Sequence, residues 1–213
     1  MAGPPLSPDA FAASAHVSRE TLARLQTYAD LLIRWQKAIN LVGSSTLPDL
    51  WRRHFADSAQ LFDLMPPATR VLVDLGSGAG FPGMVLALMG VAEVHLIESD
   101  RRKATFLREV ARATGAPVQI HAARIEAVPG FAADVVTSRA CAPLEKLLGL
   151  ATPFRQPGTL GLFLKGKTVN RELTQAKKVW DIESVFRPSR TDPDGSILLV
   201  QEWARAASER QAD

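Results

Sequence analysis

The sequence predicts an open, doubly wound α/β sheet of seven strands, preceded by a helical N-terminal extension. Three observations lead to this fold class. Short apolar runs alternate with helical patterns from residue 71 to residue 203. A glycine-rich turn, which begins at Gly76, directly follows the first apolar run. Residues 1–66 show only helical periodicity, and a Pro-Pro pair separates them from the first strand.

The helices and strands are expected in the order that such a sheet requires. In the extension, residues 1–16 are expected to fray, a helix begins at the N-cap Ser18 and ends near Asn40, and a second helix spans about 47–64. The main domain is expected at 67–205 and a disordered tail at 206–213. Strands are expected from Val71 and at 93–99, 118–122, 133–138, 159–165, 183–187 and 197–203, and helices after the glycine turn and at 100–114, 144–154 and 170–180.

Length and composition exclude several classes of protein. The 213 residues suffice for one α/β domain with a short extension. No run of about 18 apolar residues predicts a membrane span, and the first residues do not resemble a secretory signal. Cys141 is the only cysteine, so an intrachain disulfide and a cysteine-built zinc site are excluded. We therefore expect a cytoplasmic, metal-free monomer that does not bind membranes.

The net charge of +3 is modest, but the basic residues are clustered. Between residues 155 and 190 there are eight Lys or Arg residues and three acids. A second cluster consists of Arg101, Arg102, Lys103, Arg108 and Arg112. Local excesses of this kind suit a polyanion such as RNA, although solvated helix faces give the same pattern.

The glycine turn is compatible with two cofactors. Its Gly78-x-Gly80-x-x-Gly83 spacing matches the dinucleotide fingerprint, and Glu98 lies where the ribose-binding acid of a NAD site is found. The fuller pattern, with Asp74 two residues before Gly76, resembles the first motif of S-adenosylmethionine (SAM)-dependent methyltransferases. An acid near the loop suits the cationic SAM and would repel a pyrophosphate. The spacing therefore favours SAM, with Asp74, Gly76, Gly78 and Glu98 as candidate cofactor residues.

Further candidates lie after the strands, because ligands of open α/β sheets bind at the carboxyl edge. Ile125 could pack on the adenine ring, unless its segment is a plain surface loop. Arg139, after the fourth strand, suits an RNA phosphate or a cofactor carboxylate, or else forms a surface salt bridge. Cys141 is interpreted as a buried small thiol rather than a nucleophile. Lys165, at the end of the fifth strand, is a candidate RNA contact.

The second N-terminal helix carries another candidate group. His54, Asp57 and Ser58 share a helix face by their spacing. We expect a His54–Asp57 pair to anchor this helix to the sheet edge and to offer Arg52 or Arg53 to RNA.

Several motifs together resemble one family, the bacterial small-subunit ribosomal RNA guanine-N7 methyltransferases first named glucose-inhibited division protein B. They are Trp35-Gln-Lys-Ala-Ile-Asn-Leu41, Arg53-His54-x-x-Asp57-Ser58, Asp74-Leu-Gly-Ser-Gly-Ala-Gly-Phe-Pro-Gly83, Phe106-Leu-Arg108, Ser138-Arg-Ala140 and Leu164-Lys-Gly166. The resemblance implies a SAM-dependent enzyme that methylates N7 of a guanine in 16S rRNA, free or in the small ribosomal subunit. It also implies cofactor contacts at Gly76, Phe81, Ile125, Glu126 and Arg139. Our candidate RNA contacts are Arg53, His54, Arg139 and Lys165.

The acceptor atom explains why no catalytic acid or base motif follows the fourth strand. Guanine N7 has an in-plane lone pair and no proton to lose, so positioning is the main requirement. We therefore expect no catalytic base. In an RNA duplex N7 faces a deep groove, so a loop or splayed base is the expected target. Two alternatives remain at this point, a nicotinamide-dependent oxidoreductase and a non-enzymatic RNA-binding factor that retains SAM.

Overall fold

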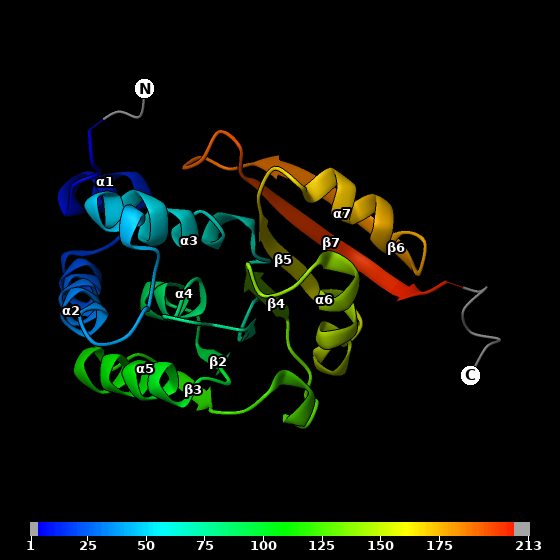
Figure 1. The fold of residues 1–213 in the computed structure, drawn as a ribbon, viewed down its shortest axis with the longest axis horizontal. Helices are drawn as coiled ribbons and strands as arrows, with labels where there is room; N and C mark the ends of the chain where they lie inside the picture. The colour runs from blue at the N-terminus through cyan, green and yellow to red at the C-terminus, as the bar shows by residue number, and fades with distance from the viewer. Residues whose placement is uncertain (1–3, 207–213) are drawn as a thin grey trace.

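A mostly parallel sheet forms the centre of the molecule, of which this computed structural model describes residues 4–206. The strand order is β3-β2-β1-β4-β5-β7-β6, and β7 runs antiparallel to both of its neighbours (Figure 1). From β1 the chain adds strands toward one edge of the sheet as β2 and β3, and it then adds the remaining strands toward the other edge, beginning with β4. Open α/β sheets bind ligands at this switch point between β1 and β4. The predicted fold class is confirmed. The strands are β1 Val71–Leu75, β2 Glu93–Ile97, β3 Val118–His121, β4 Val135–Arg139, β5 Leu160–Lys165, β6 Trp180–Pro188 and β7 Ser196–Arg205.

Helices cover both faces of the sheet. On one face lie α4 (Gly83–Met89) and α5 (Arg101–Thr114), and α2 (Arg19–Gln36) packs over both. On the other face lie α6 (Leu144–Ala151) and α7 (Val169–Ala176). Alternate residues of β1 enter the two cores, since Leu72 packs under α4 and Val73 packs toward α6. Because helices cover both faces of the sheet, its parallel strands are apolar on both sides, which explains the short apolar runs in the sequence.

The N-terminal extension differs from the sequence prediction at two points. The expected fraying is wrong for residues 8–15, because α1 spans Pro8–Ala15 with a Ser7 N-cap and a fully buried Phe11, and residues 1–3 lie outside the described residues. The expected helix at 47–64 is also wrong as a single element. The segment consists of short turns of different pitch, and Pro48, which has no N–H to donate, lies in the first of them. They are the 3₁₀ helix η1 (Ser44–Asp49), the π helix η2 (Trp51–Ala56), α3 (Asp57–Ala59) and the 3₁₀ helix η3 (Phe62–Leu64).

Aromatic packing joins the extension to the main sheet. The ring of Tyr28 on α2 stacks on Phe81 of the glycine loop, with centroids 5.2 Å apart. The Tyr28 hydroxyl donates a hydrogen bond to the Ala79 carbonyl in the same loop. Phe55 of η2 lies edge-on to both rings. A single hydrophobic core therefore contains residues of the extension and residues of the β1–α4 region.

The C-terminal part forms a long β6–β7 hairpin (Figure 1). The helix expected at 170–180 ends at Ala176, and Trp180 already belongs to β6, where it is buried. Residues 207–213 of the expected tail lie outside the described residues. Among residues 4–206, no helix is long and apolar enough to cross a membrane.

Candidate functional site

The glycine loop between β1 and α4 contains two glycines with different surroundings. Gly76 has a φ of 68°, and a Cβ at this position would lie 2.6 Å from Cys141 Sγ. Gly78 has a φ of 58°, and a Cβ there would meet nothing closer than the Gly76 carbonyl oxygen at 4.0 Å. Both positions require glycine for their backbone conformation. Gly76 also permits close contact with the β4 loop, whereas Gly78 leaves open space above the glycine loop.

Asp74 lies at the end of β1 and is fully buried. Its Oδ2 accepts a hydrogen bond from the Gly83 amide at 3.0 Å, which ties β1 to the start of α4. Its Oδ1 has no hydrogen-bond partner among the described residues. Burial raises the pKa of Asp74 to about 7, against the opposing effects of the Gly83 and Ser77 hydrogen bonds. The carboxyl group is therefore poised to change protonation near neutral pH.

Glu98 directly follows β2, and its side chain binds the backbone of the glycine loop. Its Oε2 accepts from the Gly78 amide at 2.8 Å, and its Oε1 accepts from the Asp100 amide at 2.7 Å. Asp100 is itself the N-cap of α5, because its side chain accepts from the amides of Arg102 and Lys103. Glu98 thus holds the loop and the helix in a fixed relation, and each carboxylate oxygen still has a second lone pair.

A cavity of about 270 Å³, here called the glycine-loop cavity, opens beside Glu98 at the carboxyl ends of β1 and β2. The structure brings four predicted cofactor residues together in its lining, Gly76, Glu98, Ile125 and Glu126. The last two belong to the short 3₁₀ helix η4 (Ile125–Ala127). Phe81 does not line this cavity and is buried between Tyr28 and His54.

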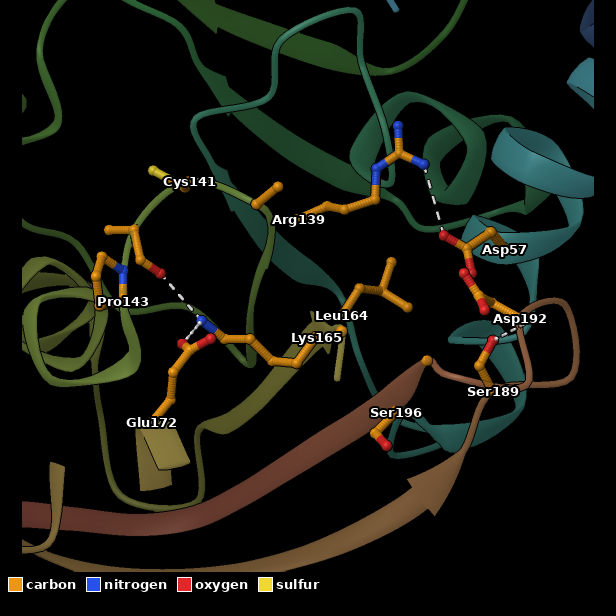
Figure 2. Close-up of a pocket in the computed structure, with 14 residues that line it drawn as sticks. Asp57, Arg139, Cys141, Pro143, Leu164, Lys165, Glu172, Ser189, Asp192 and Ser196 are labelled. Carbon is orange, nitrogen blue, oxygen red and sulfur yellow. Dashed lines mark hydrogen bonds and ion pairs between the residues drawn. The ribbon is translucent and has the colours of Figure 1, made fainter. Parts of the chain in front are cut away.

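A larger cavity of about 580 Å³, here called the β4–β5 cavity, is also lined by the loop that follows β4 (Figure 2). Its lining combines residues from β4, β5, α7, the extension and the β6–β7 turn, including Arg139, Lys165, Glu172, Asp57 and Asp192. Cys141 and Ala142 line both cavities. The segment Ala140–Pro143, here called the β4 loop, is therefore a shared wall. It begins in a constrained conformation, since Ala140 has a φ of 53°.

Arg139 leaves the end of β4 and points toward the extension (Figure 2). Its Nη2 donates to His54 Nδ1 at 2.9 Å, and its Nη1 donates to the Arg53 carbonyl at 3.2 Å and lies 3.5 Å from Asp57 Oδ2. The guanidinium lies over the ring of Phe81, 5.1 Å from its centroid. Burial lowers the pKa of Arg139 from its ordinary value, although a guanidinium stays charged in proteins.

His54 is part of this network and is only 6 % exposed. Burial, followed by the positive charges of Arg139 and Arg53, lowers the pKa of His54 to about 3. The neutral ring accepts from Arg139 at Nδ1, so Nε2 carries the proton and donates to Thr46 Oγ1 at 2.7 Å. The expected His54–Asp57 pair is wrong, because both ring nitrogens of His54 are bonded to other residues. Asp57 Oδ1 accepts from Thr191 Oγ1 at 2.6 Å and from Gln60 Nε2 at 3.0 Å.

The predicted RNA-contact residues differ in their access to solvent. The Arg53 side chain is 41 % exposed and pairs with Asp192 at 2.9 Å. The Lys165 side chain is 6 % exposed and pairs with Glu172 at 2.8 Å. Lys165 is therefore shielded within the cavity lining and His54 is buried, whereas Arg53 is at the surface. Cys141 is exposed, so its interpretation as a buried thiol is wrong. Its pKa is nevertheless raised, chiefly by desolvation.

Sequence reasoning missed two acids in the larger cavity, Glu172 and Asp192. Glu172 lies on α7 and Asp192 in the β6–β7 turn, and neither belongs to a strand end of the parallel sheet. Only tertiary folding brings them to Lys165 and Arg53, so the local sequence contains no signal for either pair. Among the described residues, no group of three or more His, Cys, Asp or Glu side chains is placed to hold a metal ion.

The strand order, the antiparallel β7 and the glycine loop above the switch point between β1 and β4 define the Rossmann-like fold of SAM-dependent methyltransferases. Solved structures share it. A putative O-methyltransferase from Klebsiella pneumoniae superposes with a TM-score of 0.58 at 15 % identity, covering 84 % of this chain and 90 % of that chain. TYW2 from M. jannaschii, in complex with AdoMet, gives a TM-score of 0.54 at 16 % identity, covering 72 % and 76 %.

Sequence comparison identifies the family. The family model GidB, rRNA small subunit methyltransferase G, matches residues 21–192. The ribosomal RNA small subunit methyltransferase G of Rhodospirillum centenum is 60 % identical over 194 residues, which cover 91 % of this chain and 90 % of the relative. The protein of the same name from Rhodospirillum rubrum is 55 % identical, with 94 % and 100 % coverage. The chain belongs to the rRNA small subunit methyltransferase G family.

Proposed function

We propose that this chain transfers the methyl group of SAM to N7 of a guanine in 16S rRNA. The observation that carries the proposal is the pair of cavities that share the β4 loop as a wall. A cofactor in one cavity and a base in the other would meet beside Cys141 and Ala142. Family membership supports the activity and the substrate class.

The residues that line the glycine-loop cavity, together with Asp74 and Gly78 beside it, fit SAM, which supplies an electrophilic methyl group on a positively charged sulfur. The open space above Gly78 would be filled by any larger side chain. The carboxylate of Glu98 can accept the ribose hydroxyls of an adenosine, and Ile125 offers an apolar surface for the adenine ring. The unpartnered Oδ1 of Asp74 supplies negative charge behind the loop, which favours a cation and disfavours the pyrophosphate of NAD.

The residues around the β4–β5 cavity fit an acceptor that has no proton to lose. The acids Asp57, Glu172 and Asp192 in this cavity wall are each paired with a cation. The raised pKa of Cys141 keeps its thiol protonated at neutral pH. Neither group is set up as a general base or a nucleophile, and N7 of guanine needs neither. The chain's task is to orient N7 toward the methyl group and to exclude water.

The route by which RNA contacts the protein completes the proposal. A splayed guanine enters the β4–β5 cavity, and the exposed Arg53 at its rim contacts a neighbouring phosphate. Arg139 lies at the junction of the extension and the β4 loop, where it orients the cofactor and the target. His54 and Lys165 act from inside by holding Arg139 and the β4 loop. We further propose that the protein acts as a cytoplasmic monomer in which residues 1–66 and 67–205 form one unit.

Methyl transfer can be tested directly. The purified protein is incubated with tritium-labelled SAM and with small subunits, or free 16S rRNA, from a strain that lacks the corresponding gene. We expect label in 16S rRNA at one guanine, with chemical cleavage specific for N7-methylguanine locating the site. Unlabelled RNA would contradict the activity, and label on another atom would contradict the N7 assignment. Calorimetric binding of NAD but not SAM would favour the oxidoreductase alternative.

A further inference from the structure

Lys165 and Glu172 form an ion pair inside the wall of the β4–β5 cavity. The Lys165 Nζ lies 2.8 Å from Glu172 Oε2, with side-chain exposures of 6 % and 21 % (Figure 2). Thr168 Oγ1 donates to the other carboxylate oxygen of Glu172 at 2.9 Å. The hydrogen bond from Lys165 contributes, after the opposing effect of desolvation, to a pKa of Glu172 below its ordinary value. The Glu172 carboxyl therefore stays ionised at neutral pH.

The same two side chains also hold both ends of one backbone segment. The Lys165 Nζ donates to the Ala142 carbonyl at 3.0 Å, and the Leu144 amide donates to Glu172 Oε2 at 3.0 Å. Leu144 is the first residue of α6, and Ala142 belongs to the β4 loop. One partly buried ion pair thus connects β5 and α7 to the loop that lines both cavities.

The opposite side of the β4 loop has little freedom as well. Gly76 approaches Cys141 so closely that a Cβ could not be accommodated without movement. Arg139, the residue before the loop, is bonded to the extension through His54. The Lys165–Glu172 pair is therefore the side-chain contact that fixes the loop from the side of the β4–β5 cavity.

We propose that Lys165 and Glu172 are positioning residues, whose ion pair sets the placement of the β4 loop and hence the alignment of the two cavities. One of its tests, the single-turnover rate of methyl transfer, rests on the function proposed above. It replaces the sequence-based expectation that Lys165 contacts an RNA phosphate. A phosphate contact would have to break two hydrogen bonds and leave the Glu172 carboxylate without its cation.

The single cysteine offers a direct reporter of the loop. Cys141 lies in the β4 loop and is the only thiol of the chain, so labelling with the neutral reagent N-ethylmaleimide reports loop access without further engineering. Lys165 lowers the pKa of this thiol by its charge, so its removal raises that pKa. The labelling rate must therefore be followed into the alkaline range, where the limiting rate of the thiolate measures access alone.

We expect the limiting labelling rate to rise several-fold in Lys165→Met. Lys177→Met, which removes an exposed lysine just after α7, serves as the matched control and should label like the wild type. An unchanged limiting rate in Lys165→Met would overturn the proposal, whatever the methyltransferase assay shows. A faster limiting labelling rate in Lys165→Met, found together with a wild-type protein that methylates no RNA, would contradict the proposed function. It would leave the proposed role of the ion pair in placing the β4 loop intact.

A double variant separates positioning from stability. Lys165→Met leaves the partly buried Glu172 carboxylate without its cation, whereas Lys165→Met with Glu172→Met replaces the whole pair by apolar side chains. We expect the double variant to unfold near the wild-type temperature and yet to keep a single-turnover rate at least tenfold below wild type. Recovery of both stability and rate would show a merely structural role. If the slope of log RNA affinity against log salt concentration became shallower by about one unit, Lys165 would be in direct contact with an RNA phosphate. Recovery of stability and rate, or this change of slope, would overturn the proposal.

Discussion

Asp74 combines full burial with an oxygen that has no partner among the described residues. A buried carboxylate in this state is costly, and its raised pKa is the physical consequence. A cation that enters the neighbouring cavity favours the ionised form. Protonation of Asp74 and binding of a positively charged cofactor are therefore linked.

This linkage predicts that SAM affinity depends on pH. Because the pKa of Asp74 is about 7 without ligand, binding of a cation releases a proton below that pH. The dissociation constant for SAM should fall as the pH rises toward 7, by at most about tenfold per pH unit, and then level off. Calorimetry with S-adenosylhomocysteine, which lacks the sulfonium charge, should show a smaller dependence. An equally steep dependence in Asp74→Asn would contradict this origin.

His54 shows the opposite shift, since its pKa falls from 6.5 to about 3. In the unfolded chain the ring takes up a proton below pH 6.5, whereas in the folded protein it stays neutral down to about pH 3. The stabilisation supplied by the neutral ring is therefore present above pH 6.5 and is lost progressively as the pH falls between these two values.

Comparison with His54→Asn isolates this effect, because the asparagine carbonyl can still accept from Arg139. The free energy of unfolding of the wild type should exceed that of the variant at pH 7. Their difference should shrink by up to about 1.4 kcal/mol per pH unit below pH 6.5. Urea unfolding at several pH values measures both proteins. A difference that stays constant with pH would show that His54 can be protonated in the fold.

At the scale of elements, the glycine loop and the β4 loop are packed against each other at one point. Gly76→Ala should be destabilising by about 1–3 kcal/mol, because alanine is strained at positive φ and its Cβ would push Cys141 aside. Cys141→Ala removes the sulfur, which would lie 2.6 Å from the alanine methyl group at position 76, and leaves the Cβ of residue 141 at 3.1 Å. The double variant should therefore recover part of the loss, as measured by urea unfolding.

Cys141→Ala alone tests the chemistry of the same loop. We expect single-turnover methyl transfer within a few-fold of wild type, because no covalent intermediate is needed for a guanine N7 acceptor. A loss of several orders of magnitude, or a covalent adduct between RNA and this cysteine, would contradict the proposed mechanism.

The elements also show where sequence reasoning succeeds and where it ends. The glycine turn and Glu98 could be located because a parallel strand, a turn that needs positive φ and an acid after the next strand are local patterns. The partner of Lys165 could not, since a lysine at a strand end has the same sequence signature whether it faces solvent or Glu172. The helix expected at 47–64 failed because apolar spacing does not distinguish α, 3₁₀ and π turns, which differ in backbone pairing.

At the scale of the molecule, the shared aromatic core predicts how the chain unfolds. Tyr28, Phe55 and Phe81 belong to one core, although they come from both sides of the Pro-Pro pair. Residues 1–66 are therefore expected to unfold together with the sheet, in one transition.

Tryptophan fluorescence can follow the two parts separately. Trp35 and Trp51 lie in the extension, and Trp180 and Trp203 lie in the β6–β7 hairpin. If Trp35 and Trp51 are replaced by phenylalanine, the remaining tryptophans report on the hairpin. If Trp180 and Trp203 are replaced instead, the remaining tryptophans report on the extension. Within each variant, the fluorescence and far-ultraviolet circular dichroism midpoints should coincide. An earlier fluorescence transition in the variant that reports on the extension would show that residues 1–66 form a separate folding unit.

The wall of the β4–β5 cavity joins segments that are far apart in the chain. Asp57 accepts from Thr191, and Arg53 pairs with Asp192, across some 130 residues of sequence. During biosynthesis Arg53 and Asp57 are therefore made well before their partners Asp192 and Thr191. A nascent chain therefore has no complete cavity until residues 189–196 have been synthesised and the hairpin has closed. Synthesis of the β6–β7 turn, rather than folding of the residues before it, sets the earliest moment at which this cavity is complete.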